Sequence, residues 1–188
     1  MSRTTVRKHA SRHGYHHGDL RRTLLEAARD EISANGVQAL SLASLARKAG
    51  VAQSAPYRHF TDRDELVAAV ATLGFETFTA TLLSAAEAGD EAGALGRMYA
   101  AYLRFGEENI QLYRLMFASG LVAGTPENSA LRMAALASFQ PLLDRVGDAS
   151  RQRARAAANA IWAQLHGFVM LKADGLLTEP AEVMLKSL

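Results

Sequence analysis

The stretch LARKAGVAQSAPYRHF, residues 45–60, places two short helical segments on either side of a bend at Gly50. Glycine can reverse the chain there because it lacks a Cβ and adopts positive φ without strain. Ala46 and Ala49 are small enough for the two segments to cross closely. Three apolar residues can anchor the second segment from behind: Val51, Tyr57 and Phe60. The stretch therefore predicts a helix-turn-helix.

Around this bend the chain is rich in Ala and Leu and lacks sustained apolar–polar alternation, so we expect an all-α protein. Asp19 is the expected N-cap of a first helix over 20–34, which Asn35-Gly36 would end. Ser41 is the expected N-cap of a second helix that stops at Gly50. A further long helix is expected to begin after an N-cap at Thr61 or Asp62 and to run toward Glu87. The other expected helices cover 53–59, 91–105, 107–118, 127–146, 151–174 and 179–188.

The composition limits the classes of function. With 188 residues, 49% of them hydrophobic and 21% charged, the chain has the make-up of an ordinary folded protein. It contains no cysteine, which excludes disulfides, thiolate metal sites and a cysteine nucleophile. No run of about 18 apolar residues is evident, so we expect no membrane partner. No apolar signal segment follows the basic N-terminus, so we expect a cytoplasmic location.

No catalytic arrangement is evident, so we expect neither an enzyme nor a cofactor. The sequence holds no Gly-rich phosphate loop, nucleophile elbow or paired-carboxylate pattern. The run His16-His17-Gly18-Asp19 comes nearest to a metal-binding motif. Adjacent histidines point apart, however, and no further ligand cluster accompanies them, so we expect no bound metal.

The charges are distributed unevenly along the chain. Residues 1–63 hold 11 Lys and Arg against 5 Asp and Glu, whereas residues 64–188 hold 10 against 14. Four of the six histidines also lie in the first 17 residues. This asymmetry indicates that the N-terminal part meets a polyanion, or alternatively that it carries a solvated basic tail with no partner. Residues 1–17 lack periodicity, and we expect them to form a flexible basic arm.

The outer surface of the expected 53–59 helix carries side chains suited to a DNA major groove. A Gln side chain can bond an adenine edge, an Ala methyl can pack against a thymine methyl, and Arg can bond guanine or a phosphate. The residues on this surface are Gln53, Ser54, Ala55 and Arg58. The alternative is a helical corner that uses the same turn without meeting DNA.

The segment SLASLARKAGVAQSAPYRHFTDRDEL, residues 41–66, resembles the DNA-binding signature of the TetR/AcrR family of bacterial transcriptional regulators. The matching features are Ser41, Leu45-Ala46, Ala49-Gly50-Val51, Tyr57-Arg58-His59-Phe60 and Arg63-Asp64. YHHGDLRRTLLEAA, residues 15–28, resembles the first helix of one branch of the family. IWAQLHGFVMLKADG, residues 161–175, resembles the Trp…His-Gly helix of that branch.

The resemblance implies a helix-turn-helix DNA-binding domain over 18–63 and a helical ligand-binding and dimerisation domain over 64–188. Residues at positions that match the family's DNA contacts fall into two groups. By this match Gln53, Ser54 and Ala55 would face bases, while Ser41, Tyr57, His59 and Arg63 would hold phosphates, and Arg58 could do either. Core packing of Tyr57 and a solvated His59 are the alternatives. The arm residues would follow phosphates, enter a minor groove or contact nothing, and they are Arg3, Arg7, Lys8 and Arg12.

Two departures from the family pattern concern the reading of bases. Ala52 stands where the family has a Ser or Thr, so an N-cap oxygen and a phosphate contact are missing. Pro56 replaces a leucine-like residue and lacks the N–H of an early helical hydrogen bond, although a proline is tolerated near the start of a helix. We therefore expect the fold to be kept and the geometry of base reading to be altered.

A single recognition helix buries too little surface for specificity, so we expect a homodimer on a palindromic operator in double-stranded DNA. The expected dimer surface is the 151–174 helix, which the resemblance places, together with the final helix over 179–188, in a four-helix bundle with the same two helices of a second copy. Small residues on this helix would let a second copy approach closely. They are Ala156, Ala160, Ala163 and Gly167.

The C-terminal half also concentrates bulky side chains with a few polar tips, which suits a small, mainly apolar effector. They are Tyr102, Phe105, Tyr113, Met116, Phe117, Phe139, Trp162 and His166. Trp162 and His166 are four residues apart on one helix face and can share a site. Plain core packing would explain the same residues.

The expected function is thus a repressor that a ligand releases from DNA. The alternative is a DNA-binding dimer without a small-molecule inducer, controlled by a protein partner or acting as an activator. A pocket large enough for a ligand would favour the first function, and a tightly filled core would favour the second.

Overall fold

The computed structural model describes residues 17–146 and 151–185, and every regular element in these two ranges is helical. The helices are α1 (His17–Asn35), η1 (Val37–Ala39), α2 (Leu42–Lys48), η2 (Pro56–Arg58), α3 (Arg63–Glu87), α4 (Ala94–Glu108), α5 (Ile110–Phe117), α6 (Ala130–Ala137), α7 (Gln140–Arg145), α8 (Arg151–Ala173) and α9 (Ala181–Leu185). η1 and η2 are single 3₁₀ turns. The predicted all-α fold, with an N-terminal helix-turn-helix and a C-terminal helical region, is confirmed. The basic arm predicted for residues 1–17 lies outside the described residues except for His17.

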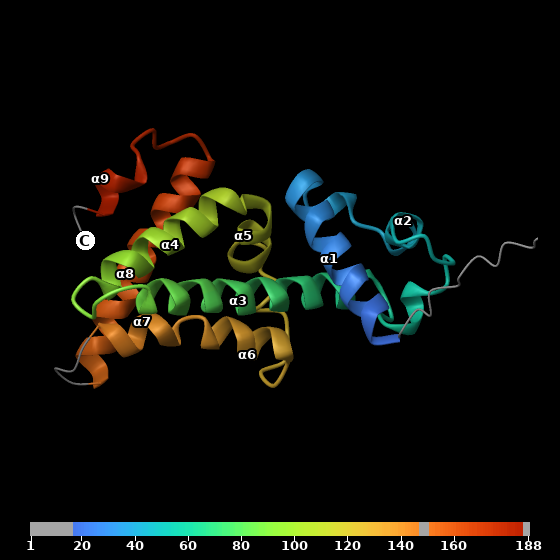
Figure 1. The fold of residues 1–188 in the computed structure, drawn as a ribbon, viewed down its shortest axis with the longest axis horizontal. Coiled ribbons are helices and arrows are strands. Elements are labelled where there is room, and N and C mark those ends of the chain that lie inside the picture. Colours follow the sequence, from blue (N-terminus) through green and yellow to red (C-terminus); the bar gives the residue numbers. More distant parts are fainter. Residues whose placement is uncertain (1–16, 147–150, 186–188) are drawn as a thin grey trace, which may run out of the picture.

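α3 runs through the middle of the molecule and joins its two ends (Figure 1). α1 and α2 lie near its N-terminus, α4 and α5 lie on one side of it, and α6 and α7 lie on the other (Figure 1). One apolar core extends from Leu20 on α1 to Val169 on α8. The largest buried side chains on α3 face this core: Leu66, Val70, Phe75, Phe78 and Leu82. A displacement of α3 would therefore be felt both in the helix-turn-helix and in the C-terminal core.

Among the described helices, only α3 is long and apolar enough, by composition, to cross a membrane. This finding differs from the sequence-based expectation that no segment is apolar enough to span a membrane. About 44% of its most apolar window is buried inside the protein, however. Its apolar residues are the ones that pack against the helices around it, so its composition is that of a core helix.

The N-terminus of α3 is closed by hydrogen bonds. Asp62 is the N-cap, and its Oδ1 accepts from the N–H of Glu65 at 2.8 Å. The Glu65 carboxylate accepts in return from the N–H of Thr61 at 2.6 Å and from its hydroxyl at 2.8 Å. These hydrogen bonds from Thr61 lower the pKa of Glu65. The start of α3 is therefore fixed immediately after the helix-turn-helix.

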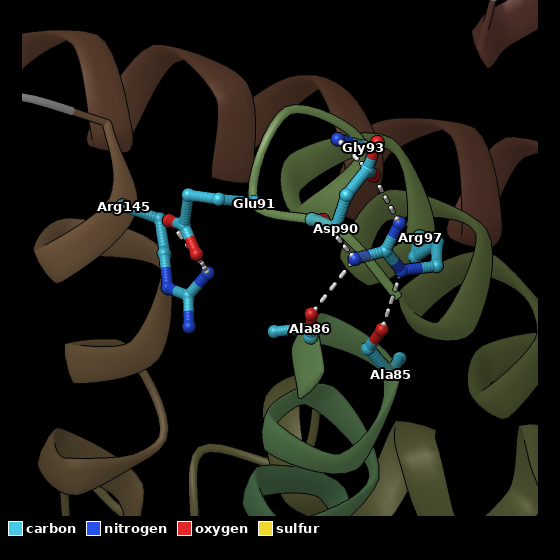
Figure 2. Close-up of polar contacts among 7 residues, drawn as sticks. All are labelled: Ala85, Ala86, Asp90, Glu91, Gly93, Arg97 and Arg145. Carbon is cyan, nitrogen blue, oxygen red and sulfur yellow. Dashed lines mark hydrogen bonds and ion pairs between the residues drawn. The ribbon is translucent and has the colours of Figure 1, made fainter. Parts of the chain in front are cut away.

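The C-terminus of α3 is closed by Arg97 of α4 (Figure 2). The Arg97 guanidinium donates to the carbonyls of Ala85 at 3.0 Å, Ala86 at 2.9 Å and Asp90 at 2.5 Å. Ala85 and Ala86 belong to the last turn of α3, where carbonyls lack partners within the helix, and a cation also suits the negative end of the helix dipole. The same loop is tied to α7, because Arg145 donates to the Glu91 carboxylate at 2.9 Å (Figure 2).

Three predicted helix boundaries are wrong. α1 begins at His17, so Asp19 lies inside the helix and is not its N-cap, whereas Gly36 ends the helix as expected with a φ of 76°. The predicted helix over 127–146 is two helices, α6 and α7. Pro141 explains the break, since it cannot donate the helical hydrogen bond to the Ala137 carbonyl. The predicted helix over 179–188 is reduced to α9, and residues 186–188 lie outside the described part.

Candidate nucleic-acid interface and ligand pocket

The helix-turn-helix is built around the bend at Gly50, whose φ is 66°. This conformation strains any residue with a Cβ, so the sequence-based role of the glycine is confirmed. The N–H of Val51 donates to the carbonyl of Ala46 at 3.0 Å and fastens the bend to α2. Ser41 caps the other end of α2, because its Oγ accepts from the N–H of Ser44 at 3.1 Å.

A buried carboxylate holds α1 against α2. Glu31 of α1 is 8% exposed, and it accepts hydrogen bonds from Lys48 of α2 and, at 2.9 Å, from Asn35. The hydrogen bond from Lys48 is the main reason why the pKa of Glu31 lies below its usual value. Sequence reasoning missed this pair, since the partners are far apart in the chain and no periodicity links them.

Residues 53–59 do not form the predicted α-helix. The N–H of Ala55 donates to Ala52 at 2.9 Å and the N–H of Arg58 donates to Ala55 at 3.2 Å, so the segment consists of turns that include η2. Pro56 is the physical reason, because it has no N–H for the α-helical hydrogen bond to the Ala52 carbonyl. Ala52 also offers no side-chain oxygen that could cap a helix here.

The segment nevertheless presents the predicted side chains on the surface. Gln53, Ser54 and Arg58 are exposed, and Ala55 is half-buried. Tyr57 is 56% exposed, so its predicted role as an anchor behind this segment is wrong. The buried anchors are Pro56 and Phe60, with Val51 half-buried beside them. The polar tip of Tyr57 is thereby free to meet an external group.

Two predicted phosphate contacts are placed differently. His59 is half-buried, and its Nε2 is buried without a hydrogen-bond partner in the described part of the chain. The Arg63 side chain is 39% exposed, but its guanidinium is bonded to the main chain. Its Nε donates to the carbonyl of Leu40 at 3.0 Å and its Nη2 donates to that of Val37 at 2.5 Å. Arg58, by contrast, makes no hydrogen bond or ion pair with a described residue.

The C-terminal core contains a chain of hydrogen bonds that joins three helices. The indole Nε1 of Trp162 donates to the hydroxyl of Tyr102 at 2.9 Å, and this hydroxyl lies 2.8 Å from that of Tyr113. The Tyr113 hydroxyl lies 2.7 Å from Nδ1 of His166. Burial raises the pKa of both tyrosines and lowers that of His166, so all four groups are neutral near pH 7.

Three of the predicted pocket residues line one hollow in this core, namely Tyr102, Phe139 and Trp162. The hollow has a volume of about 10 Å³, enough for one water molecule and not for a larger ligand. The rings of Phe139 and Trp162 stack over it with centroids 4.9 Å apart, and both are half-buried. The lining residues that sequence reasoning missed are Phe78, Leu82, Met98, Tyr99, Ser138, Leu142 and Leu165.

The remaining predicted residues lie beside the hollow. Tyr113 and Phe117 of α5 contact His166 through their rings, at centroid distances of 5.6 and 5.7 Å. Met116 faces Gly74 of α3, where an added Cβ would lie 2.8 Å from the Met116 sulfur. Met116 therefore serves the close packing of α5 on α3 and does not line the hollow. The ring of Phe105 packs against that of Phe78, with 5.1 Å between the ring centroids.

The outer face of α8 carries the small residues that were expected to meet a second copy. Ala156, Ala160 and Ala163 are exposed, and no atom lies within 4 Å of the position that a Cβ would take at Gly167. Leu171 and Leu176 extend this face as exposed large apolar residues.

Within the described residues, no three His, Asp or Glu side chains gather as a metal site would require.

Two family models match the chain. The one described as "Bacterial regulatory proteins, tetR family" matches residues 24–70, which include the helix-turn-helix. The one described as "Tetracyclin repressor-like, C-terminal domain" matches residues 95–187. None of the curated proteins compared with the chain matches it.

Several solved structures share the arrangement of helices. A protein of unknown function from Rhodococcus sp. RHA1 is 32% identical, with a TM-score of 0.80 over 93% of this chain and 94% of that one. PfmR, a TetR family transcriptional regulator from Thermus thermophilus, is 22% identical, with a TM-score of 0.62 over 87% and 93%. A TetR-family transcriptional regulator from Pectobacterium atrosepticum is 22% identical, with a TM-score of 0.64 over 91% and 89%. At this identity the last two indicate a shared fold.

Proposed function

The chain belongs to the TetR family of bacterial DNA-binding transcriptional regulators, and on this premise we propose that it is a homodimeric repressor of a palindromic operator. A small, mainly apolar ligand in the C-terminal core would release it from DNA. The observation that carries the proposal is the set of exposed polar side chains beyond the fixed bend at Gly50. We expect the protein to act in the bacterial cytoplasm, where the chromosome lies.

The proposed base contacts come from the segment after the bend. Gln53 and Ser54 are exposed and can bond base edges, while Ala55 offers a methyl group. Tyr57 and Ser41 would hold phosphates through their hydroxyls. The Ser41 hydroxyl already accepts a capping hydrogen bond but can still donate one. Arg58 has a guanidinium without a described partner and could bond either a guanine or a phosphate.

The proposed dimer forms through the outer face of α8. Its exposed alanines and the open surface at Gly167 would let the same helix of a second copy approach closely. Two copies related by a two-fold axis would present two bent units to successive major grooves. Specific binding would then need both half-sites, since one unit buries too little surface.

The proposed ligand site is the hollow beneath Phe139 and Trp162. No charged side chain lines it, so a neutral ligand fits its chemistry. Because the hollow holds no more than a water molecule, ligand entry would require Phe139 and Trp162 to separate. A ligand would shift the protein away from DNA only if it bound the opened core better than the closed one.

The filled core favours a second candidate function, a DNA-binding dimer without a small-molecule inducer. The hollow is water-sized, and two of its polar groups, the Trp162 indole and the Tyr102 hydroxyl, already bond one another. Such a protein would be controlled by a partner protein or would act as an activator. Small neutral aromatic compounds that release the protein from DNA would favour the first function, and indifference to all of them would favour the second.

The test is selection of binding sites by the purified full-length protein from a random-sequence duplex library at physiological salt. The proposal predicts enrichment of an inverted repeat whose half-sites lie about one helical turn, roughly 10–10.5 base pairs, apart. Sedimentation velocity of the complex should show two protein chains per selected duplex. Failure to enrich any sequence, or one chain per duplex, would overturn the proposal.

A further inference from the structure

Arg63 occupies a position where the family resemblance implies a phosphate contact, yet its guanidinium is already engaged. Its Nε and Nη2 donate to two main-chain carbonyls, those of Leu40 and Val37. The third nitrogen, Nη1, lies 3.8 Å from the carboxylate of Asp64. A phosphate at this place would have to compete with an anion and with two hydrogen bonds to the main chain.

The two carbonyls belong to the connection between α1 and α2. Val37 begins η1, and its carbonyl also accepts from the N–H of Leu40 at 3.3 Å. The carbonyl of Leu40 belongs to the peptide group that carries the nitrogen of Ser41. Leu40 is buried, so its carbonyl has few other groups to satisfy it. Arg63 is therefore hydrogen-bonded to the peptide group that immediately precedes α2.

Arg63 is also the first residue of α3, next to the Asp62 cap. The guanidinium thus joins the start of the long central helix to the start of α2. A Lys could keep the charge at this position, but it lacks the planar fork that fixes two donor directions at once. The connection is directional as well as electrostatic, and it crosses 23 residues of the chain to Leu40.

We propose that Arg63 is a positioning residue for DNA recognition and does not bind phosphate. It sets the orientation of Ser41 and α2 relative to α3. The inference rests on the proposed function, because it assumes site-specific DNA binding. Any displacement of α3 in the C-terminal core would reach Ser41 through this guanidinium. Loss of the two hydrogen bonds would impair specific recognition and leave the general attraction to DNA in place.

The test compares Arg63→Lys, Arg63→Met and, as a matched control, Arg58→Met in the full-length protein. Affinity is measured for the duplex that the wild-type protein selects from a random library and for a scrambled duplex, each at several salt concentrations. Thermal unfolding monitors folding. For both Arg63 variants we expect a lower melting temperature, because the Leu40 carbonyl loses its donor, and about tenfold weaker binding to the selected duplex, because Ser41 and α2 are no longer held in the orientation that DNA requires. Their affinity for the scrambled duplex and their salt dependence should stay close to wild type.

A phosphate-binding Arg63 would give a different pattern. Arg63→Lys would then keep its affinity, and Arg63→Met would lower the slope of log affinity against log salt by about 2 for a dimer, at about 0.9 per contact. Either result would overturn the proposal, and Arg58→Met shows what loss of a DNA-contacting charge looks like. A purely structural role would lower the melting temperature and weaken binding to both duplexes equally, which would also overturn it.

Failure of this inference is distinguishable from failure of the proposed function. If the wild-type protein selects no duplex, the proposed function fails before any variant is compared. If it does select one and the Arg63 variants keep the wild-type ratio of specific to non-specific affinity, only the positioning role fails.

Discussion

The hydroxyl of Tyr113 lies 2.7 Å from Nδ1 of His166, and with a proton-free Nδ1 at this end every hydroxyl of the buried hydrogen-bond chain has both a donor and an acceptor. The indole N–H of Trp162 can only donate, so the Tyr102 hydroxyl accepts from it, and Tyr113 is the described acceptor for the Tyr102 O–H. Tyr113 then donates to His166, which requires a neutral imidazole with no proton on Nδ1. Protonation of His166 would make Nδ1 a donor to Tyr113, which would then donate to Tyr102 and leave the buried Tyr102 O–H without an acceptor.

The first prediction concerns pH. Burial lowers the pKa of His166 in the folded protein below its ordinary value of 6.5. Because the unfolded chain takes up the proton more readily, the stabilisation from neutral His166 is complete above pH 6.5 and is lost as the pH falls from 6.5 toward the folded-state pKa. Denaturant titrations at a series of pH values should show this loss in the wild type and a smaller one in His166→Gln. An identical pH dependence in the two proteins would contradict the need for a proton-free Nδ1.

The second prediction concerns Tyr113→Phe. This change leaves a buried Tyr102 hydroxyl without its acceptor and His166 without its donor, so we expect a loss of about 1–3 kcal/mol in the free energy of unfolding. Tyr99→Phe is the matched control, since Tyr99 is buried and its hydroxyl makes no hydrogen bond with the described residues. Equal effects of the two changes on unfolding in urea would show that the chain adds no stability.

The third prediction concerns the packing of α4 on α8. A Cβ at Gly106 would lie 2.6 Å from Cγ1 and 2.7 Å from Cγ2 of Val169, so the two helices must separate in Gly106→Ala. We expect about 1–3 kcal/mol of destabilisation from this overpacking. Gly96→Ala on the same helix is the control, because nothing lies within 4 Å of its Cβ position. That control should gain about 0.5–1 kcal/mol from helix propensity, and destabilisation of both variants would refute the steric argument.

The fourth prediction concerns Arg58→Ala. Arg58 is exposed after the bend and has no described partner, so its removal should not alter the melting temperature. Binding to the selected duplex should weaken about tenfold or more, as expected for the loss of an Arg contact to a base or phosphate. Arg104→Ala removes a similarly exposed Arg from α4 and should bind like the wild type in a fluorescence-anisotropy titration. Wild-type affinity of Arg58→Ala would remove this residue from the interface.

The sequence was informative where local rules decide the structure. Gly50 had to turn the chain, Ser41 had to cap α2 and Gly36 had to end α1, and each does so. The prediction of an α-helix over 53–59 is wrong for an equally local reason. A proline is tolerated early in a helix, but here Pro56 stands in a segment that also lacks an N-cap oxygen. The exposure of Tyr57 does not follow from a helix over 53–59, because the direction in which a side chain points depends on the number of residues per turn.

Contacts between distant segments were beyond the sequence. The engagement of Arg63 depends on two carbonyls in the connection between α1 and α2, and no residue pattern records where main-chain carbonyls point. The hydrogen-bond chain was half visible, because Trp162 and His166 share a helix face. Its middle members, Tyr102 and Tyr113, come from α4 and α5, and only the packing of three helices brings the four groups together.

The measurement that tests the central claim most directly is the salt dependence of the wild-type protein's affinity for the duplex it selects. If a dimer neutralises about 6–10 phosphates, the affinity should fall roughly 10³–10⁵-fold between 50 and 200 mM salt. That result would establish an electrostatic DNA interface of the expected size. An affinity that stays flat over this range would contradict the account, because the exposed surface beyond Gly50 would then make no phosphate contacts.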